Sequence, residues 1–290
     1  MEVRELGEEE WPKEEWGQRL HEIPQPPERL WVRGLMPPAG HKLLVVVGSR
    51  AMTRYGQEAC QILIAGLAGY PISIVSGLAL GMDTCAHKAA LAAGLHTLAL
   101  PGSGLDDEAI YPRSNRGFAK DILEKGGGML SEYPPDARSH IHYFPARNRL
   151  MVGLADAVLI VEAGPKSGTL ITARLASEYN RDLLAVPHRI GDPHAFGPHL
   201  FIRLGAALVS EPLHILEALK IAPRQEGEAR NAPTDLDGAE IAVWELLEEP
   251  LARDDILREI GGNPGETLTA LVALELRGLI REEFGLWRRV

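Results

Sequence analysis

The sequence predicts an α/β protein with an open, doubly wound and mostly parallel sheet, followed by a small, mainly helical C-terminal domain. Short, nearly all-apolar segments alternate with longer helical ones, which is typical of parallel strands covered by helices on both faces. Several apolar segments end in glycine-rich turns, as strands do where they lead into a helix. A proline-rich stretch precedes this alternating pattern, and a stretch with few apolar residues follows it.

The central elements follow from these patterns in chain order. "KLLVVVG" at 42–48 and "PISIVSG" at 71–77 are short apolar runs and predict strands, whereas the alanine-rich "MDTCAHKAALAAG" at 82–94 predicts a helix. By the same criteria the expected strands are 42–48, 71–77, 96–102, 127–134, 155–163, 182–188 and 206–210, and the expected helices are 56–70, 82–94, 117–127 and 168–180.

Composition predicts the domain boundaries. Residues 23–40 are proline-rich around an extended "RLWVRG", and residues 221–238 have few apolar side chains, as a linker does. The expected organisation is an acidic, proline-rich lead-in at 1–40, the α/β domain at 41–222, a linker at 223–238 and the C-terminal domain at 239–290.

The net charge of −10 is unevenly distributed. Residues 1–40 carry a net −4 and residues 224–290 a net −7, so residues 41–223 are close to neutral at +1 and hold 9 of the 10 histidines. A basic patch that could bind a polyanion is therefore still possible in the central region.

The compartment follows from cysteine usage and from the absence of targeting signals in the sequence given. The two cysteines have no CxxC spacing, the N-terminus is acidic, and no run of about 18 apolar residues occurs. These features predict a soluble, cytoplasmic protein with no membrane contact.

Glycine-rich turns follow several of the expected strands. Because the carboxyl ends of parallel strands lie at one edge of a sheet, these turns can present backbone amides to anions. A row of such turns fits phosphates spaced along a nucleic-acid strand better than it fits a single nucleotide. The turns are "VGSR" (47–50), "SGLALG" (76–81), "LPGSG" (100–104) and "GPKSGT" (164–169).

Two nucleotide motifs are excluded. In "GPKSGT" Lys166 precedes the second glycine, so the turn is not a Walker loop, and "GSRAMTRYG" lacks the three spaced glycines of a dinucleotide site. The sequence therefore predicts neither ATP hydrolysis nor NAD binding, and no other cofactor.

The chain resembles the DprA/Smf family of bacterial DNA-processing proteins over residues 43–210. The resemblance rests on "VVGSR", "SIVSGLALGMDTCAHKAAL", "YPRSN", "SEYPP", "FPARNRLMVGLADAVLIVEAGPKSGTLITA" and "LAVPH", in consistent order. It implies a Rossmann-like homodimer that binds and protects incoming single-stranded DNA. The dimer would load RecA recombinase onto strands coated by single-stranded DNA-binding protein during natural transformation and homologous recombination, without catalysing a reaction.

The resemblance also implies which positions bind DNA. A forked arginine, a mobile lysine and hydroxyls at a helix start are suited to phosphate oxygens. The expected positions are Gly48, Ser49, Arg50, Ser76, Gly77, Arg147, Arg149, Lys166, Ser167, Gly168 and Thr169.

Alternatives remain for the segment "HIHYFPARNR". Asn148 and one of the two arginines, Arg147 or Arg149, could tie down backbone and leave only the other arginine for the ligand. Bases could stack on the rings of His140, His142, Tyr143 and Phe144, although a phenylalanine before proline is more often part of the core.

Catalytic and metal sites are not expected. Asp83 and His87 have the spacing of an acid and base pair, but a helix-capping aspartate and a buttressing histidine explain them better. His188, His194 and His199 share one loop without positioned carboxylates, so no metal site is predicted.

The main alternative function is a nucleotide-binding enzyme of the phosphoribohydrolase, lysine decarboxylase-like type. That group resembles this fold and carries a PGGxGTxxE loop with an acid/base glutamate. "GPKSGTLIT" keeps Gly168 and Thr169 but has Thr172 where the glutamate belongs. The sequence therefore favours a protein that is not an enzyme.

The C-terminal pattern of three helices and a short hairpin is typical of a winged helix and again resembles a domain of the DprA/Smf family. Its third helix offers Glu266, Glu275 and only Arg277. A protein-contact or structural role is favoured over DNA reading, with Arg288 and Arg289 as the basic cluster. In the α/β domain the apolar segment 199–209 is expected to form the dimer surface, although a buried core strand would explain it equally well.

Overall fold

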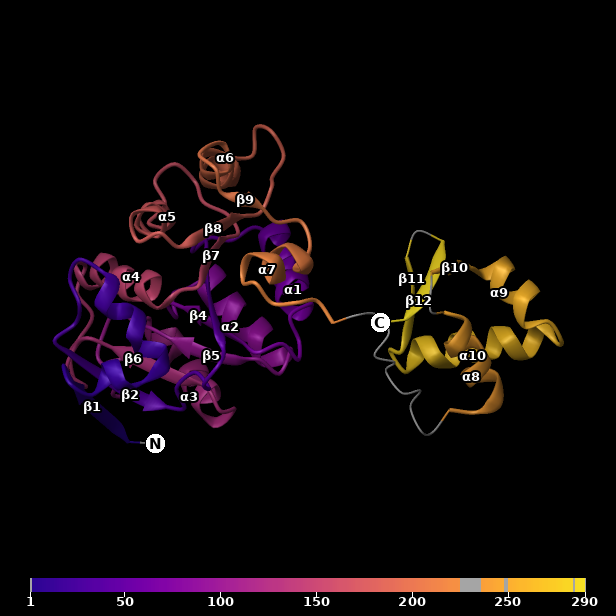
Figure 1. Cartoon of the computed structure of the whole chain (residues 1–290), viewed down its shortest axis with the longest axis horizontal. Coiled ribbons are helices and arrows are strands. Elements are labelled where there is room, and N and C mark those ends of the chain that lie inside the picture. The colour runs from indigo at the N-terminus through magenta and orange to yellow at the C-terminus, as the bar shows by residue number, and fades with distance from the viewer. Residues whose placement is uncertain (1, 225–235, 248–249, 284, 290) are drawn as a thin grey trace. The chain divides into compact units, whose positions relative to one another are not determined.

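The computed structural model describes residues 2–224, 236–247, 250–283 and 285–289. It divides into two compact units, residues 1–223 and residues 224–290 (Figure 1). Most of the expected linker at 223–238 lies outside the described residues. Among the described residues, no helix combines the length and the apolarity needed to cross a membrane.

The first unit contains a nine-stranded sheet in the order β1-β2-β6-β5-β4-β3-β7-β8-β9. Neighbouring strands from β6 to β9 pair in parallel, and β2 and β1 extend the sheet antiparallel beside β6. The strands are β1 Val3–Gly7, β2 Arg29–Gly34, β3 Lys42–Val47, β4 Ile72–Ser76, β5 His96–Ala99, β6 Gly128–Ser131, β7 Ala157–Ile160, β8 Asp182–Ala185 and β9 Ala207–Leu208.

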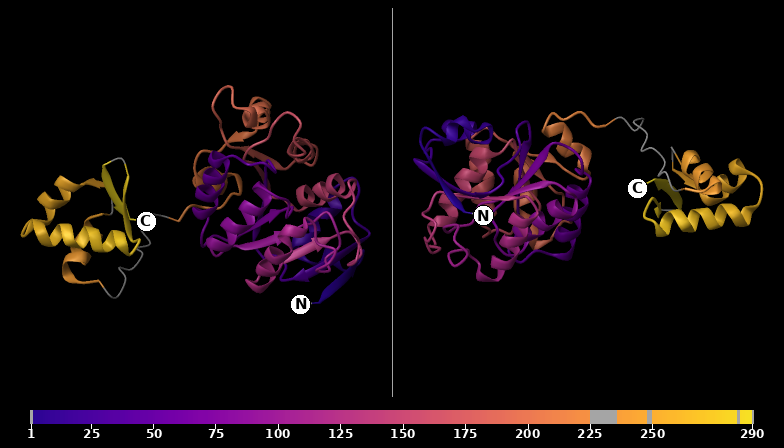
Figure 2. Two further views of the ribbon diagram at one scale, coloured as in Figure 1. Left: turned by 180° about the vertical axis from the view of Figure 1, so that it is seen from behind. Right: turned by 90° about the horizontal axis from the view of Figure 1, so that it is seen from below.

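Helices cover both faces of this sheet (Figure 2). Four short 3-10 helices, η1 Trp11–Lys13, η2 Glu15–Glu22, η3 Arg113–Asn115 and η4 Pro193–Ala195, lie in the connections. The α-helices are α1 Arg54–Ala65, α2 Met82–Ala92, α3 Arg116–Glu124, α4 Tyr143–Leu154, α5 Thr169–Glu178, α6 Phe196–Arg203 and α7 Pro212–Ala218.

The alternation of side chains along β3 explains the two layers of core. Leu43, Val45 and Val47 pack with the N-terminal segment, α4, α5 and α6, whereas Leu44 and Val46 pack with α1, α2 and α7. Successive residues of a strand face opposite sides of a sheet, so an all-apolar strand is stable only between two helical layers. The predicted doubly wound, mostly parallel fold is confirmed.

The strand order reverses between β3 and β7. From β3 the chain winds through β4 and β5 to β6 on one side, and from β7 it winds through β8 to β9 on the other. The connections that leave the carboxyl ends of these two neighbours therefore diverge and open a crevice, which is where open α/β sheets bind ligands.

The N-terminal lead-in is built into the sheet rather than preceding it. β2, the extended "RLWVRG" of the sequence, pairs with β6, and β1 pairs with β2. Trp11, Leu20 and Ile23 of this region are buried in the same core as α4.

The segment 199–209 is not a single buried core strand, which was the alternative to a dimer surface. Residues up to Arg203 form α6, and only Ala207 and Leu208 form a strand, at the outer edge of the sheet. Phe201 packs into the core, whereas Leu204 and Leu208 are 71% and 47% exposed. The apolar pattern therefore arises from a helix and an edge strand that share one segment.

The second unit is a winged helix, as predicted. An Asp237–Glu240 capping box starts α8, and Val243, Trp244 and Leu271 lie in its own core. The elements are α8 Gly238–Leu246, β10 Leu251–Ala252, α9 Arg253–Ile260, α10 Pro264–Leu276, β11 Ile280–Glu283 and β12 Leu286–Arg289, with the strands in the order β10-β12-β11.

Candidate nucleic-acid interface

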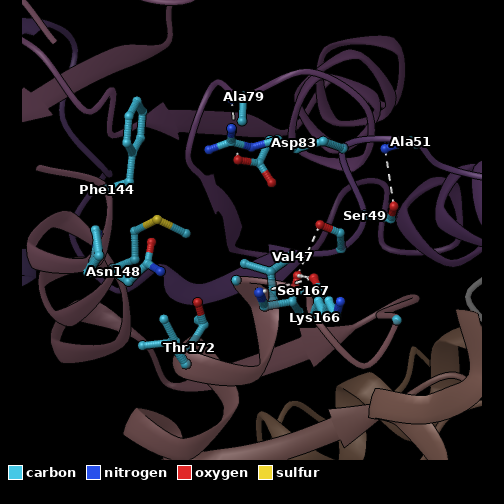
Figure 3. Close-up of a pocket in the computed structure, with 18 of the residues that line it drawn as sticks. Val47, Ser49, Ala51, Ala79, Asp83, Phe144, Asn148, Lys166, Ser167 and Thr172 are labelled. Carbon is cyan, nitrogen blue, oxygen red and sulfur yellow. Dashed lines mark hydrogen bonds between the residues drawn. The ribbon is translucent and has the colours of Figure 1, made fainter. Parts of the chain in front are cut away.

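A cavity of about 710 Å³ lies where the strand order reverses, between the turns that follow β3 and β7 (Figure 3). Its size is that of a small-ligand site. The residues that line it are Val47, Gly48, Ser49, Arg50, Ala51, Ala79, Asp83, Phe144, Pro145, Arg147, Asn148, Met151, Gly164, Pro165, Lys166, Ser167, Gly168, Thr169, Ile171, Thr172 and His194.

The turn after β3 is held by its own backbone and by α2. Ser49 Oγ accepts a hydrogen bond from the amide of Ala51 (3.1 Å), and the amide of Met82 donates to Ser49 O (3.0 Å). A Cβ on Gly48 would lie 2.6 Å from the Met82 side chain, so the close packing of α2 requires a glycine there. Arg50 is exposed, and its guanidinium lies 5.2 Å from the Phe144 ring centroid.

The turn after β7 leads into α5 and is tied to the first turn. The Thr169 hydroxyl donates to Gly48 O (3.0 Å), which joins the two turns across the strand reversal. Ser167 Oγ accepts from the Thr169 amide (3.2 Å) and donates to Thr169 Oγ1 (2.9 Å). Lys166, at the tip of this turn, is exposed.

Arg50 and Lys166 give the cavity rim its positive charge. In the described part of the chain neither takes part in an ion pair, whereas Arg54, the first residue of α1, is paired with Glu58 (2.7 Å). Unpaired cations above a helix N-terminus favour a bound anion.

Arg147 has a structural role as well as a place in the cavity lining. It is 6% exposed, its Nη1 donates to the carbonyl oxygens of Gly77 and Leu100, and its buried Nε has no partner. Burial lowers the pKa of this guanidinium. A Cβ on Gly77 would lie 2.0 Å from Nη1, so Gly77 makes room for the arginine.

Ser76, Gly77 and Arg149 do not line this cavity. Ser76 is fully buried and donates to Val46 O (2.7 Å), and Arg149 is paired with Glu132. Arg147 is therefore the arginine that ties down backbone. Arg149, which was then expected to face the ligand, forms an ion pair with Glu132 instead. The other expected positions all line the cavity: Gly48, Ser49, Arg50, Arg147, Lys166, Ser167, Gly168 and Thr169.

Several further residues line the cavity, of which only Phe144 was considered as a ligand contact from the sequence. Phe144, Asn148 and Met151 lie with Arg147 on one face of α4, a spacing of three and four residues that the sequence displays. Thr172 lies on α5 and is buried. Behind the lining, fully buried Glu162 accepts hydrogen bonds from the amide (2.9 Å) and hydroxyl (2.8 Å) of Thr53.

Asp83 and His87 do not form an acid and base pair. His87 is fully buried, its Nδ1 lies 2.7 Å from Thr97 Oγ1, and burial lowers its pKa to about 3. Asp83 lines the cavity and accepts a hydrogen bond from the Ala79 amide (3.3 Å).

The aromatic side chains of "HIHYF" separate into two environments. Phe144 is half-buried in the cavity lining, so it is not a core residue. Tyr143 instead stacks on Tyr133, with ring centroids 3.6 Å apart.

Two of the three loop histidines are hydrogen-bonded to backbone carbonyl oxygens. His199 Nε2 lies 3.0 Å from His188 O, and His188 Nδ1 lies 3.0 Å from Val186 O. Within the described ranges no group of three or more His, Cys, Asp or Glu residues could hold a metal ion.

A doubly wound α/β domain with a cationic, hydroxyl-rich crevice, followed by a winged helix, defines the class as a two-unit α/β protein with a C-terminal winged helix. The chain belongs to the family described as DNA recombination-mediator protein A, which it matches over residues 5–220. Residues 227–285 match the DprA winged helix domain. The resemblance found in the sequence is thereby confirmed.

Individual relatives agree with this assignment. Protein Smf of Escherichia coli is 40% identical over 262 residues, which cover 88% of this chain and 69% of that protein. DNA processing protein DprA of Streptococcus pneumoniae is 40% identical over 197 residues, 68% of each chain.

Two solved structures are similar. That of DprA from Streptococcus pneumoniae has a TM-score of 0.68 at 35% identity, covering 75% of this chain and 74% of that one. That of DNA processing protein A from Helicobacter pylori, described for its single-stranded DNA binding mode, has a TM-score of 0.64 at 28% identity, covering 76% and 96%.

Proposed function

We propose that this protein binds single-stranded DNA in the crevice between β3 and β7. The observation that carries the proposal is the position of Arg50 and Lys166: two unpaired cations on different turns at the rim of one cavity. Phosphates that follow one another along a strand can contact both turns. The single-stranded DNA binding described for the Helicobacter pylori protein supports this choice of ligand.

Within this proposal the protein protects incoming DNA and loads RecA recombinase onto it, during natural transformation or recombination in the cytoplasm. The strand would be held open for RecA without nucleotide hydrolysis, since "GPKSGT" is not a Walker loop. On strands coated by single-stranded DNA-binding protein, the protein should shorten the lag in filament assembly by a cognate RecA. An unchanged lag would contradict the loading role.

A homodimer is part of the proposal. The outer edge of the sheet exposes Leu204 on the turn after α6 and Leu208 on β9, and a short unpaired edge strand with apolar side chains is suited to pairing with another chain.

The phosphoribohydrolase alternative has less support. Thr172, which stands where that reaction requires a glutamate, is 2% exposed and lies in the first turns of α5. A hydroxyl at this position cannot act as the acid or base of a ribosyl transfer at neutral pH. We therefore propose a protein without enzymatic activity.

The experiment that tests the proposal compares labelled single-stranded and double-stranded oligonucleotides by fluorescence anisotropy, with a nucleotide hydrolysis assay alongside. The wild type should bind the single strand, and the double variant Arg50→Ala with Lys166→Ala should nearly abolish binding. Lys125→Ala is the matched control, because Lys125 is an exposed cation three residues before β6, at the amino ends of the parallel strands and away from the crevice at their carboxyl ends. Wild-type affinity in the double variant, or nucleotide turnover without strand binding, would contradict the proposal.

A further inference from the structure

Asp83 is a carboxylate in the lining of a cavity whose rim is suited to phosphate. It lies in the first turn of α2, is 8% exposed, and lines the same cavity as Lys166 and Arg50. A phosphate placed beside Asp83 would be repelled. The part of a nucleotide that approaches this carboxylate must therefore be the base.

The protein uses little of the hydrogen-bonding capacity of Asp83. The Ala79 amide donates to Oδ2 over a long 3.3 Å, and the neighbouring Ser76 hydroxyl, which donates to Val46 O, also favours the ionised carboxylate. An ionised carboxylate only accepts hydrogen bonds, at about four lone-pair positions. Asp83 therefore has acceptor positions left for N–H donors of a ligand.

Arg147 supplies a donor in the same cavity. Its Nη1 is bound to two carbonyl oxygens, but its Nε is buried without a partner. Buried polar atoms are nearly always paired in proteins, so an unpaired N–H in a cavity lining indicates a place for a ligand acceptor.

The remaining surroundings suit a flat ring. Phe144 and Met151 line the cavity from the same face of α4 as Arg147, and aromatic and thioether groups stack on bases or contact them. In the view of Figure 3, Asp83 and Phe144 lie in the upper part of the cavity, with Ser167 and Lys166 below them.

We infer that this cavity takes a guanine base of the bound strand, with Asp83 accepting its N1–H and N2–H. The inference rests on the proposed single-stranded DNA binding and adds a specificity to it. Guanine is the base that presents two adjacent N–H donors on its Watson–Crick edge, beside an acceptor, O6, for an N–H such as Arg147 Nε. Thymine, cytosine and adenine each place an acceptor atom where the second carboxylate oxygen requires a donor.

The test uses dT strands that differ in one central nucleotide, so that no G-rich structure can form. The strand with a central dG should bind about tenfold more tightly than the all-dT strand, the effect expected of one bidentate contact. Inosine, which lacks the 2-amino group, should lose most of this advantage. 7-Deazaguanine, which keeps N1–H and N2–H, should retain it.

The variant Asp83→Asn keeps the acceptor for Ala79 but places an amide N–H against guanine. Its affinities for the dG and dT strands should lie within about twofold of each other. Asp121→Asn is the matched control, since Asp121 is an exposed carboxylate on α3 outside the cavity lining, and it should keep the preference. Free guanosine monophosphate, added as competitor, distinguishes a base read within a strand from a free-nucleotide site.

The outcomes separate the inference from the function on which it rests. If dG, inosine and dT strands bind the wild type equally, the inference is wrong and strand binding stands. If no strand binds, the proposed function is wrong, and the inference that rests on it is wrong as well. If free guanosine monophosphate displaces nothing at concentrations far above those of the strand, the base is read only as part of DNA. If it binds while strands do not, the cavity is a nucleotide site and both proposals fall.

Discussion

Lys166 contacts no acidic side chain in the described part of the chain and lies at the rim of the cavity. In Lys166→Ala, affinity for all single strands should fall alike, because a point charge on phosphate carries no base information. The slope of log affinity against log salt should become shallower by about 0.7 for one phosphate contact. Anisotropy titrations at several salt concentrations measure this, and a slope equal to that of the wild type would mean that Lys166 makes no phosphate contact.

Asp83 should lower stability where it is ionised. Burial raises the pKa of this carboxyl, although Arg147 opposes the shift, so the folded state disfavours the charge. The cost is present above the folded-state pKa and disappears as the pH falls toward the ordinary aspartate value. Asp83→Asn should therefore melt about 2–4 °C higher than the wild type at neutral pH, and the difference should shrink on acidification.

Thermal melts of both proteins across pH provide the measurement for Asp83. The charged groups facing Asp83 are Arg147 on α4 and Arg50 on the turn after β3, while His87 on its own helix stays neutral because burial lowers its pKa to about 3. A lower melting temperature for Asp83→Asn at neutral pH would show instead that Asp83 is retained for the fold.

At the scale of elements, α6 and β9 determine how the proposed dimer should be probed. Leu200 packs against the core of the first unit, so replacing it would disturb folding as well as association. Leu204→Arg places a charge on a residue that is 71% exposed and should weaken the dimer while leaving the melting temperature of the monomer unchanged.

Sedimentation at micromolar concentration distinguishes the outcomes for this surface. The wild type should sediment as a dimer and Leu204→Arg largely as a monomer, with Leu35→Arg, an exposed leucine that follows β2, as the control. Two monomers, or two equally stable dimers, would contradict the assignment of this surface.

The sequence predicted the elements well where a single pattern determines them. The apolar runs of β3 and β7 could be placed because they are short, contain β-branched residues and are bounded by turn residues, which favours a strand buried on both faces. The segment 199–209 was harder, because Phe201 and Leu204 fit either a strand or a helix when read as a short apolar run.

The candidate site was predicted in part for a similar reason. Gly48, Lys166 and Thr169 follow strands and carry recognisable chemistry, so their convergence at one edge could be inferred. The pairing of Arg149 with Glu132 and the burial of Ser76 depend on tertiary packing, which no local pattern displays. Asp83 was considered only with His87, since its sequence spacing suggested a partner on its own helix rather than a ligand.

At the scale of the whole molecule, the winged-helix unit is acidic, and we expect it not to read DNA. Residues 224–290 carry 15 acidic and 8 basic side chains. The exposed face of α10 presents Leu268, Val272 and Leu276, and Arg289 is held against Trp244 by hydrogen bonds to its carbonyl and by stacking at 4.9 Å.

A chain that ends at Pro223 should consequently keep its affinity for single-stranded DNA within about twofold. The first unit has its own cores and should fold alone. Anisotropy on the truncated and full chains measures the difference, and a loss of tenfold or more would assign DNA contacts to the winged helix.

The hydrogen bond from Thr169 to Gly48 O spans 121 positions of the chain. Each turn is held in part by the other, so the site does not depend on one stretch of sequence alone. If the loop "GPKSGT" were transplanted onto an unrelated strand and helix, its lysine and hydroxyls would be present. The turn after β3, which accepts the Thr169 hydrogen bond, would be missing. A change in one of these turns should therefore also alter the orientation of the other, on the opposite side of the same strand reversal.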